Sequence, residues 1–295
     1  MKKRKSDKVS TWLFLSPALI FLAITALFPL LYSLYLSFFK YKLNLPNQTP
    51  VFVGLENYIK MLTDSLLHTS TWNTILFAVI SVALEVVLGL MLAMILCSDK
   101  MWARIVTSIF MIPMIMAPVA IGTMWRMMLD ATTGVINYLL SFLGIGAIQW
   151  LSDPTMAKVS VLLVNVWQLT PWVAIICVAG LKALPGECIQ AALVDGATPR
   201  QIFWKIVLPL VKPVLVIVIM MRFTDAFKVF DTIYTMTNGG PGTATRVVSL
   251  VIYNRAFVDY KFSSALAMSV ILFVIILVLT VAARGIAGHF NYENK

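Results

Sequence analysis

Six long apolar runs, separated by shorter polar segments, dominate this chain. They cover approximately residues 12–39, 72–97, 103–129, 157–181, 212–236 and 263–284. A helix needs about 20 apolar residues to cross the hydrocarbon core of a bilayer, and each run is long enough. The regular alternation that marks a membrane β-barrel is absent from the sequence. The pattern therefore predicts an all-α, polytopic membrane protein with six transmembrane helices.

Composition strengthens this prediction, because 60% of the 295 residues are hydrophobic and only 12% are charged. The six runs and their connections use almost the whole length. We therefore expect one transmembrane domain over residues 12–284, with short tails at 1–11 and 285–295. The three cysteines, Cys97, Cys177 and Cys188, are odd in number and lie in or near the runs. They are expected to be reduced packing residues and not a disulfide framework.

The basic residues indicate how the chain crosses the membrane. The net charge is +10, and 13 of the 23 Lys and Arg residues lie in alternate polar segments. These segments are the two tails, the connection between the second and third runs, and the connection between the fourth and fifth. The positive-inside rule places all four on the cytoplasmic side. The basic excess is thereby explained by topology, and nucleic-acid binding is not expected.

The connection over residues 184–213 is the one polar segment with a pattern of its own. Pro185 suits a first helical position, and Gly196 suits a left-handed residue that ends a helix. The tetrapeptide 198–201, Thr-Pro-Arg-Gln, is typical of a capping box that starts a second helix. That second helix is expected to stop before Pro209. Two short helices with a sharp turn, lying on the cytoplasmic side, predict a contact surface for another protein.

The second run carries an acidic residue, Glu85, near its middle. A carboxyl group at that depth is costly, so Glu85 is expected to be protonated or paired. Two roles are open: a buried hydrogen bond between helices, or a direct part in transport.

The fourth run is polar at one level, where Asn165, Gln168 and Thr170 lie beside Trp167 and Trp172. Aromatic rings next to amides suit a sugar, which has an apolar face and a rim of hydroxyl groups. Packing between helices through amide hydrogen bonds is the alternative. Asn165, Trp167, Gln168 and Trp172 are therefore candidates for the solute pathway.

The fifth run carries Arg222, Asp225, Lys228 and Asp231 at three-residue spacing. On one helix this spacing forms a slanted stripe of alternating charge, which has to face protein or an aqueous cavity. Arg222–Asp225 and Lys228–Asp231 could pair within the helix, and Arg222–Glu85 is a competing pair between helices. The stripe could be a structural ladder, or Lys228 and Asp231 could contact a solute near the exterior.

Several classes of chemistry have no support in the sequence. There is no phosphate-binding loop, no HExxH or GxSxG motif, and no plausible metal-ligand spacing. The Gly-rich stretch 238–242 is a turn cluster, because no Gly-Lys-Ser/Thr follows it. The chain is therefore expected to be no enzyme and to bind no nucleotide or metal itself.

The connection over 184–213 resembles the EAA loop of permeases from binding-protein-dependent ABC importers. That pattern is Glu-Ala-Ala, three residues, Gly, nine residues, then Ile-x-Leu-Pro. Ala191 and Ala192, Gly196 and the ending at 206–209 match in register, whereas Gln190 replaces the glutamate. Glu187 keeps a carboxylate on roughly the same helix face. The resemblance implies that coupling to an ATPase involves Glu187, Gln190, Ala191, Ala192, Asp195, Gly196, Ala197, Phe203, Ile206, Leu208 and Pro209.

Other stretches, including SPALIFL, VGLENY and DAFKVFDTIYTMTNGGPGTAT, resemble the carbohydrate branch of these permeases. The resemblance covers nearly the whole chain. It implies the type I importer permease fold with a cytoplasmic coupling helix, in a bacterial inner membrane. It also implies a second permease subunit, a pair of ATPase subunits that bind ATP and Mg, and an extracytoplasmic binding protein. The solute would be a sugar or a sugar derivative.

Two alternatives stay open at this point. The solute could be anionic, such as glycerol-3-phosphate or an acidic sugar, with Arg222 and Lys228 as counter-ions. More remotely, the chain could be an ion-coupled secondary transporter that uses Glu85 or Asp225 to carry protons.

Overall fold

The computed structural model describes residues 3–42, 49–98 and 100–292 and is almost entirely helical. The chain divides into two compact units, Met1–Asp64 with Ile252–Val274, and Ser65–Val251 with Ile275–Lys295. In the described residues, five helices are long and apolar enough to cross a membrane. A sixth span results if one pair of helices, joined at a bend, is counted as a single span. This agrees with the six spans predicted from the apolar runs.

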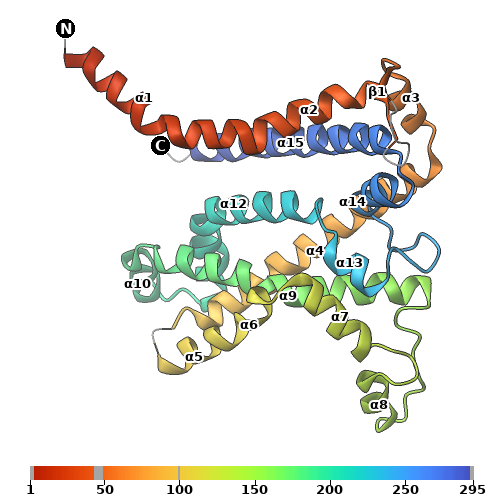
Figure 1. The fold of residues 1–295 in the computed structure, drawn as a ribbon. Helices are drawn as coiled ribbons and strands as arrows, with labels where there is room; N and C mark the ends of the chain where they lie inside the picture. The colour runs from red at the N-terminus through yellow and green to blue at the C-terminus, as the bar shows by residue number, and fades with distance from the viewer. Residues whose placement is uncertain (1–2, 43–48, 99, 293–295) are drawn as a thin grey trace. The chain divides into compact units, whose positions relative to one another are not determined.

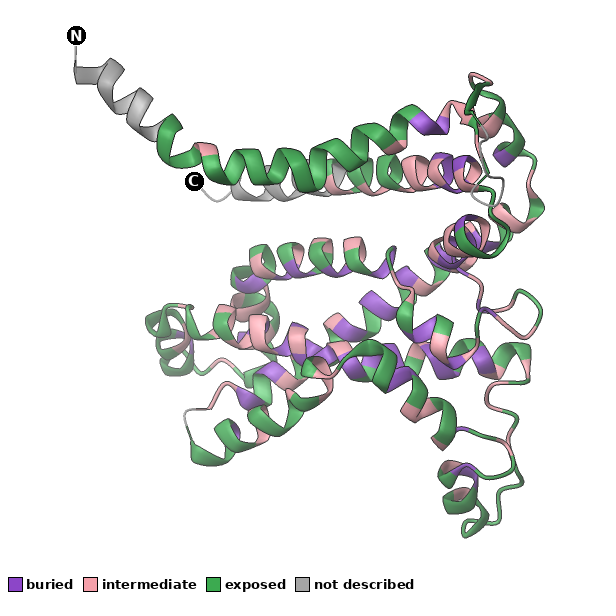
Figure 2. Ribbon diagram, in the orientation of Figure 1, coloured by how far each residue is buried: buried purple, intermediate pink, exposed green. Residues whose placement is uncertain are grey.

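The first unit begins with α1 (Lys3–Leu22), a π-helical turn η1 (Ala23–Leu27) and α2 (Phe28–Ser37), drawn in red and orange in Figure 1. The apolar stretch Trp12–Ser37 is exposed along almost its whole length (Figure 2). Strand β1 (Phe39–Lys40) then pairs antiparallel with β2 (Val51–Phe52), and α3 (Glu56–Leu62) follows. Asn57 fixes α3 to the end of α2, because its Nδ2 donates to the carbonyls of Ser37 and Phe39 at 2.8 Å.

The C-terminal part of the first unit contains a π-helical turn, η3 (Asn254–Val258), and the start of α15 (Phe262–Tyr292). Arg255 forms an ion pair with Asp64, which follows α3. The backbone N–H of Ser263 donates to the carbonyl of Tyr41 at 3.4 Å. Segments from the two ends of the chain are thereby joined in one unit.

The second unit is built around α4 (Ser65–Leu96) and α9 (Pro154–Lys182), which pack along each other. The close approach uses small residues, since Ala78 and Ala93 are fully buried. Helix α12 (Leu208–Ala226) packs on both of them, and Val173, Val211 and Val218 form the buried cluster between the three helices.

The third predicted span, 103–129, is not one straight helix. It consists of α5 (Met101–Phe110) and α6 (Ile112–Ile115), then α7 (Pro118–Met128), with a bend of 93°. Met116 and Ala117 are extended at the bend, with ψ of 145° and 130°. The residue before a proline disfavours the helical region, so Pro118 starts a new helix. A short helix, α8 (Val135–Ser141), follows this span.

The remaining elements of the unit are α10 (Gly186–Val194), α11 (Pro199–Ile202), a π-helical turn η2 (Phe203–Val207), α13 (Asp231–Met236) and α14 (Val248–Tyr253). A second buried cluster joins α7, α9 and α13 through Ile121, Val161 and Ile233. Of the predicted tails, residues 1–2 and 293–295 lie outside the described residues.

The contact between α4 and α9 at Gly89 gives a test of the packing. A Cβ atom on Gly89 would lie 2.6 Å from Cγ1 of Val173, whose side chain is fully buried and has no space to move. We expect Gly89→Ala to lower the free energy of unfolding by about 1–3 kcal/mol, although alanine favours a helix. The measurement is the thermal unfolding midpoint in detergent. Gly146→Ala is the control, because nothing lies within 4 Å of that Cβ. Equal midpoints for both variants would contradict this packing.

Candidate functional site

The connection between α9 and α12 contains the sharp turn predicted from its glycine. Helix α10 ends at Val194, and Gly196, two residues later, has a φ of +73°. The N–H of Ala197 donates to the carbonyl of Ala192 at 2.9 Å, and the N–H of Gly196 donates to that of Leu193 at 3.1 Å. These two bonds form a Schellman motif, which satisfies carbonyls that the helix end leaves unpaired. One detail differs from the prediction: Pro185 is the N-cap residue of α10, and the first helical residue is Gly186.

The second helix of the connection begins with the predicted capping box. The Thr198 hydroxyl accepts from the N–H of Gln201, and the Gln201 side chain accepts from the N–H of Thr198 at 2.8 Å. Both bonds satisfy donors of the first helical turn. The turn between α10 and α11 is therefore fixed at both sides by hydrogen bonds that depend on Gly196, Thr198 and Gln201.

The prediction that this helix stops before Pro209 is wrong. Residues Pro199–Ala226 form one continuous helical span, in which η2 joins α11 to α12. The N–H of Leu208 donates to the carbonyl of Phe203, five residues earlier, so the turn before the proline is wide. Proline lacks an N–H and clashes with the carbonyl four residues before it, and a π-turn accommodates both defects. The wide turn of η1 likewise ends two residues before Pro29.

The predicted coupling residues differ in exposure. Ala192 is buried against the protein, and Phe203, Ile206 and Leu208 are half-buried. Glu187, Gln190, Ala191, Asp195 and Pro209 are exposed, and Ala197 is half-buried. Large apolar side chains are also exposed here, since Val194 is 88% exposed and both Leu193 and Trp204 are 58% exposed. Glu187 and Gln190 lie three residues apart on α10, so both are on one face.

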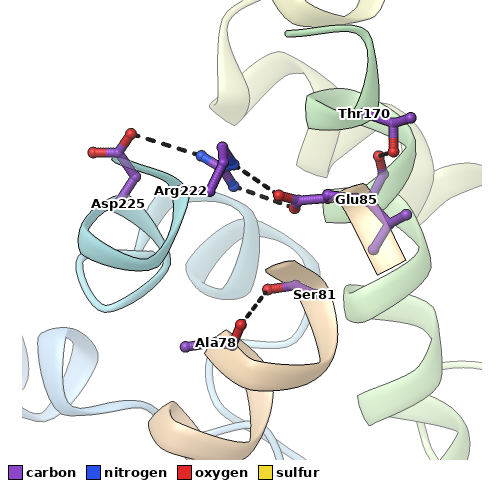
Figure 3. Close-up of polar contacts among 7 residues, drawn as sticks. Ala78, Ser81, Glu85, Thr170, Arg222 and Asp225 are labelled. Carbon is purple, nitrogen blue, oxygen red and sulfur yellow. Dashed lines mark hydrogen bonds and ion pairs between the residues drawn. The ribbon is translucent and has the colours of Figure 1, made fainter. Parts of the chain in front are cut away.

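A buried ion pair connects α4 and α12. Nε of Arg222 lies 2.7 Å from Oε2 of Glu85, and Nη2 lies 3.2 Å from Oε1. The two side chains point toward each other from their helices (Figure 3), and both are almost fully buried. A two-bond arrangement of guanidinium and carboxylate is the strongest geometry available to such a pair. The pair between helices, one of the two arrangements predicted for Arg222, is the dominant one.

The charged stripe does not continue along one helix. Helix α12 ends at Ala226, ten residues before the predicted end of this span, and Asp231 begins the separate helix α13. Lys228 pairs with Asp225 at 3.1 Å and not with Asp231. Arg222 also approaches Asp225, at 3.7 Å. The charges at 85, 222, 225 and 228 therefore form a connected network, and Asp231 lies outside it, exposed on α13.

The polar residues of α9 are placed differently from one another. Asn165 and Gln168 are buried, and Oδ1 of Asn165 has no hydrogen-bond partner among the described residues. Trp167 is 39% exposed and its ring meets that of Trp125 edge-on at 5.5 Å. Trp172 packs against the apolar cluster between α4, α9 and α12. In the described residues, no three His, Cys, Asp or Glu side chains could together hold a metal ion.

Together, the apolar helices and the capped helical connection define the class as a polytopic helical membrane protein. Residues 85–291 match the family described as binding-protein-dependent transport system inner membrane component, and the chain belongs to this family.

Relatives and solved structures cover most of the chain. The trehalose/maltose transport system permease protein of Thermococcus litoralis is 34% identical over 271 residues, which are 92% of this chain and 90% of that protein. The sulfoquinovosyl glycerol transport system permease protein of Agrobacterium fabrum is 33% identical over 89% of this chain and 85% of its own length. A bacterial ABC transporter that imports the acidic polysaccharide alginate has a similar fold, with a TM-score of 0.83, 21% identity and 98% of each chain covered.

The buried ion pair can be tested by removing one partner and then both. Arg222→Met leaves a buried carboxylate without its counter-ion, which should cost about 3–5 kcal/mol of stability. Glu85→Met/Arg222→Met should recover most of this loss, because an apolar pair of similar volume needs no desolvation of charge. Unfolding midpoints of the purified variants are the measurement. Asp225→Asn is the control and should cost at most about 1 kcal/mol, because Asp225 is half exposed.

Transport by the double variant separates the two roles that the sequence leaves open for Glu85. A structural pair predicts that uptake returns together with stability. A double variant that is stable but inactive would contradict the structural role and assign the charges a direct part in transport.

Proposed function

We propose that this chain is the transmembrane permease subunit of an ATP-driven importer for a sugar or a sugar-derived solute. The observation that carries the proposal is the continuous helix Pro199–Ala226, which begins at the capped turn and reaches the buried Arg222. A push on the turn can therefore reach the membrane interior without crossing a flexible joint. In this proposal, ATP and Mg bind to a pair of separate ATPase subunits, which contact α10 and α11.

The exposed apolar side chains support this contact. Leu193, Val194 and Trp204 are far more exposed than a cytoplasmic surface usually leaves such residues, and they lie beside the capped turn. A partner protein that covers them would gain hydrophobic binding energy. If the connection between α9 and α12 lies in the cytoplasm, the alternation of the six spans puts both chain termini in the cytoplasm and the segment around 130–153 outside.

The carbohydrate assignment rests on the relatives, whose names specify trehalose and maltose, trehalose, and starch degradation products. We infer that an extracytoplasmic binding protein delivers the solute and that a second, homologous permease completes the pathway. A structure with a similar fold was solved in complex with a pentasaccharide-bound periplasmic protein, at a TM-score of 0.82.

An anionic sugar is the second candidate, because similar proteins are named for sulfoquinovosyl glycerol and alginate. The charge network argues for a neutral solute in this chain. Arg222 is compensated by Glu85, and Lys228 lies 3.1 Å from Asp225, so neither cation is left over as a counter-ion.

The energy source tests the proposal against an ion-coupled transporter. Uptake by the assembled importer in vesicles should stop when ATP is depleted and should persist when an uncoupler removes the proton gradient. Uptake that survives ATP depletion and collapses with the uncoupler would overturn the proposal and favour proton coupling through Glu85 or Asp225.

The turn itself can be tested at Gly196. A β-branched residue at a φ of +73° should cost about 1–2 kcal/mol locally, although nothing lies within 4 Å of the added Cβ. We therefore expect Gly196→Val to uncouple ATP hydrolysis from uptake or to prevent assembly with the ATPase. Gly186→Val is the matched control, because Gly186 lies in the same connection with equally open space and no positive φ. Normal uptake and ATPase stimulation in Gly196→Val would contradict the coupling role.

A further inference from the structure

A pocket of about 370 Å³ lies within the first unit, between the β1–β2 pair, α3, η3 and the first turn of α15. Its lining is strongly basic. The basic residues are Lys40, Lys42, Lys60, Arg255 and Lys261, and the acidic ones are Glu56 and Asp64. The lining therefore carries five positive charges against two negative ones. Asp259, near Arg255, reduces this excess without removing it.

Both acidic residues are already paired. Lys60 bonds to Glu56 and holds the pKa of that carboxyl below its usual value, with a smaller contribution from Lys40. Asp64 pairs with Arg255, and both side chains are less than 20% exposed. Among the described residues, Lys40 and Lys261 have no ion-pair partner, so no carboxylate in the pocket neutralises their positive charges.

The first turn of α15 adds hydrogen-bond donors to the same pocket. Ser263 lines it and is 2% exposed, and its buried Oγ has no partner among the described residues. Ser264 also lines it, and its Oγ accepts from Nη1 of Arg255 at 3.3 Å. A buried hydroxyl without a partner costs stability unless something else bonds to it. The N-terminal end of a 31-residue helix also favours an anion.

Two uncommon backbone features position the cations. The π-turn η3 carries Arg255, and Tyr260 has a φ of +56°, which is rare for an aromatic residue. The N–H of Lys261 donates to the carbonyl of Arg255 at 2.8 Å, which brings the two basic residues to one wall. Such backbone conformations cost about 1–3 kcal/mol and cluster at sites with a function.

The pocket lies where two apolar helices leave the membrane. Lys40 to Lys42 follow the apolar stretch Trp12–Ser37, and Lys261 directly precedes the stretch Phe262–Val281. This position corresponds to the depth of lipid headgroups. In the proposed orientation it is the exterior side, where the positive-inside rule predicts few basic residues. Ten of the 23 Lys and Arg residues lie outside the segments predicted to be cytoplasmic, and five of these ten line this pocket.

We propose that this pocket binds the phosphate group of an anionic phospholipid, with Lys40, Lys261 and Ser263 as the principal ligands. Lysine ammonium groups and a buried hydroxyl suit the phosphate oxygens, which accept charge-assisted hydrogen bonds. A lipid fits better than an acidic protein segment, because the apolar stretch Trp12–Ser37 ends just before Lys40 and exposes side chains such as Leu31 that can contact acyl chains. Inorganic phosphate shares the headgroup's chemistry but lacks these chains.

The test compares lipids and phosphate on the assembled importer in a zwitterionic detergent. Phosphatidylglycerol should raise the unfolding midpoint more than phosphatidylcholine with the same chains, at equal ionic strength. Lys40→Gln/Lys261→Gln should weaken the affinity for phosphatidylglycerol about a hundredfold, because two charge-assisted bonds are lost. Lys158→Gln is the matched control, since Lys158 is an exposed lysine on α9 outside this pocket. It should bind the lipid as the parent protein does.

A second variant guards against a general loss of folding. Ser263→Ala removes the unpartnered hydroxyl, so the lipid-free midpoint should be equal or higher while the lipid-induced shift becomes smaller. A similar shift with inorganic phosphate alone would identify a free anion as the source of the same chemistry and support the site. Equal shifts with both lipids, or an undiminished shift in both pocket variants, would overturn the proposal. Stabilisation by an acidic binding protein but by neither lipid nor phosphate would also overturn it.

Discussion

The pair between Glu85 and Arg222 is the constraint on which the membrane part of the second unit depends. Neither charge could remain alone at that depth, because desolvating one ion costs several kcal/mol. The pair holds two helices that are far apart in sequence, and its two-bond geometry fixes their register as well as their distance. Apolar packing alone would allow α12 to slide or rotate against α4, because a shift of one apolar helix face along another changes the packing energy only a little. The ion pair does not allow it.

The second requirement is a continuous helix between the capped turn and this pair. A proline two residues into α12 would normally separate a loop helix from a membrane helix. The π-turn at Phe203–Val207 removes the clash and keeps the helix intact. The same arrangement before Pro29 indicates that the π-turn is a local response to proline and not a feature unique to the connection between α9 and α12.

Much of this architecture follows from local rules that a sequence displays. The six apolar runs, the left-handed Gly196 and the capping box of Thr198 and Gln201 each depend on neighbours within a few residues. The errors arose where local signals compete. Pro209 was expected to end a helix that a π-turn preserves. The fifth span ends at Ala226, ten residues before its predicted end. The three-residue spacing of the charges at 222, 225, 228 and 231 suits one helix, but the helix ends before the last two.

Tertiary pairing was only partly predictable. The depth of Glu85 and Arg222 suggested their contact, but spacing within one helix equally favoured Arg222 with Asp225. The basic pocket of the first unit was missed, because its residues come from segments more than 190 positions apart and no motif connects them. One signal was present in the sequence: the lysines at 40, 42, 60 and 261 lie in segments predicted to be exterior, where the positive-inside rule expects few.

The ion pair and the packing of Gly89 on Val173 together constrain how the second unit can move. Helix α4 cannot separate from α9 without opening a contact that admits no added methyl group, and it cannot separate from α12 without exposing two buried charges. Both changes cost more than the rotation of a packed block. In the proposed transport cycle, α4, α9 and α12 would therefore move as one body when the capped turn is pushed.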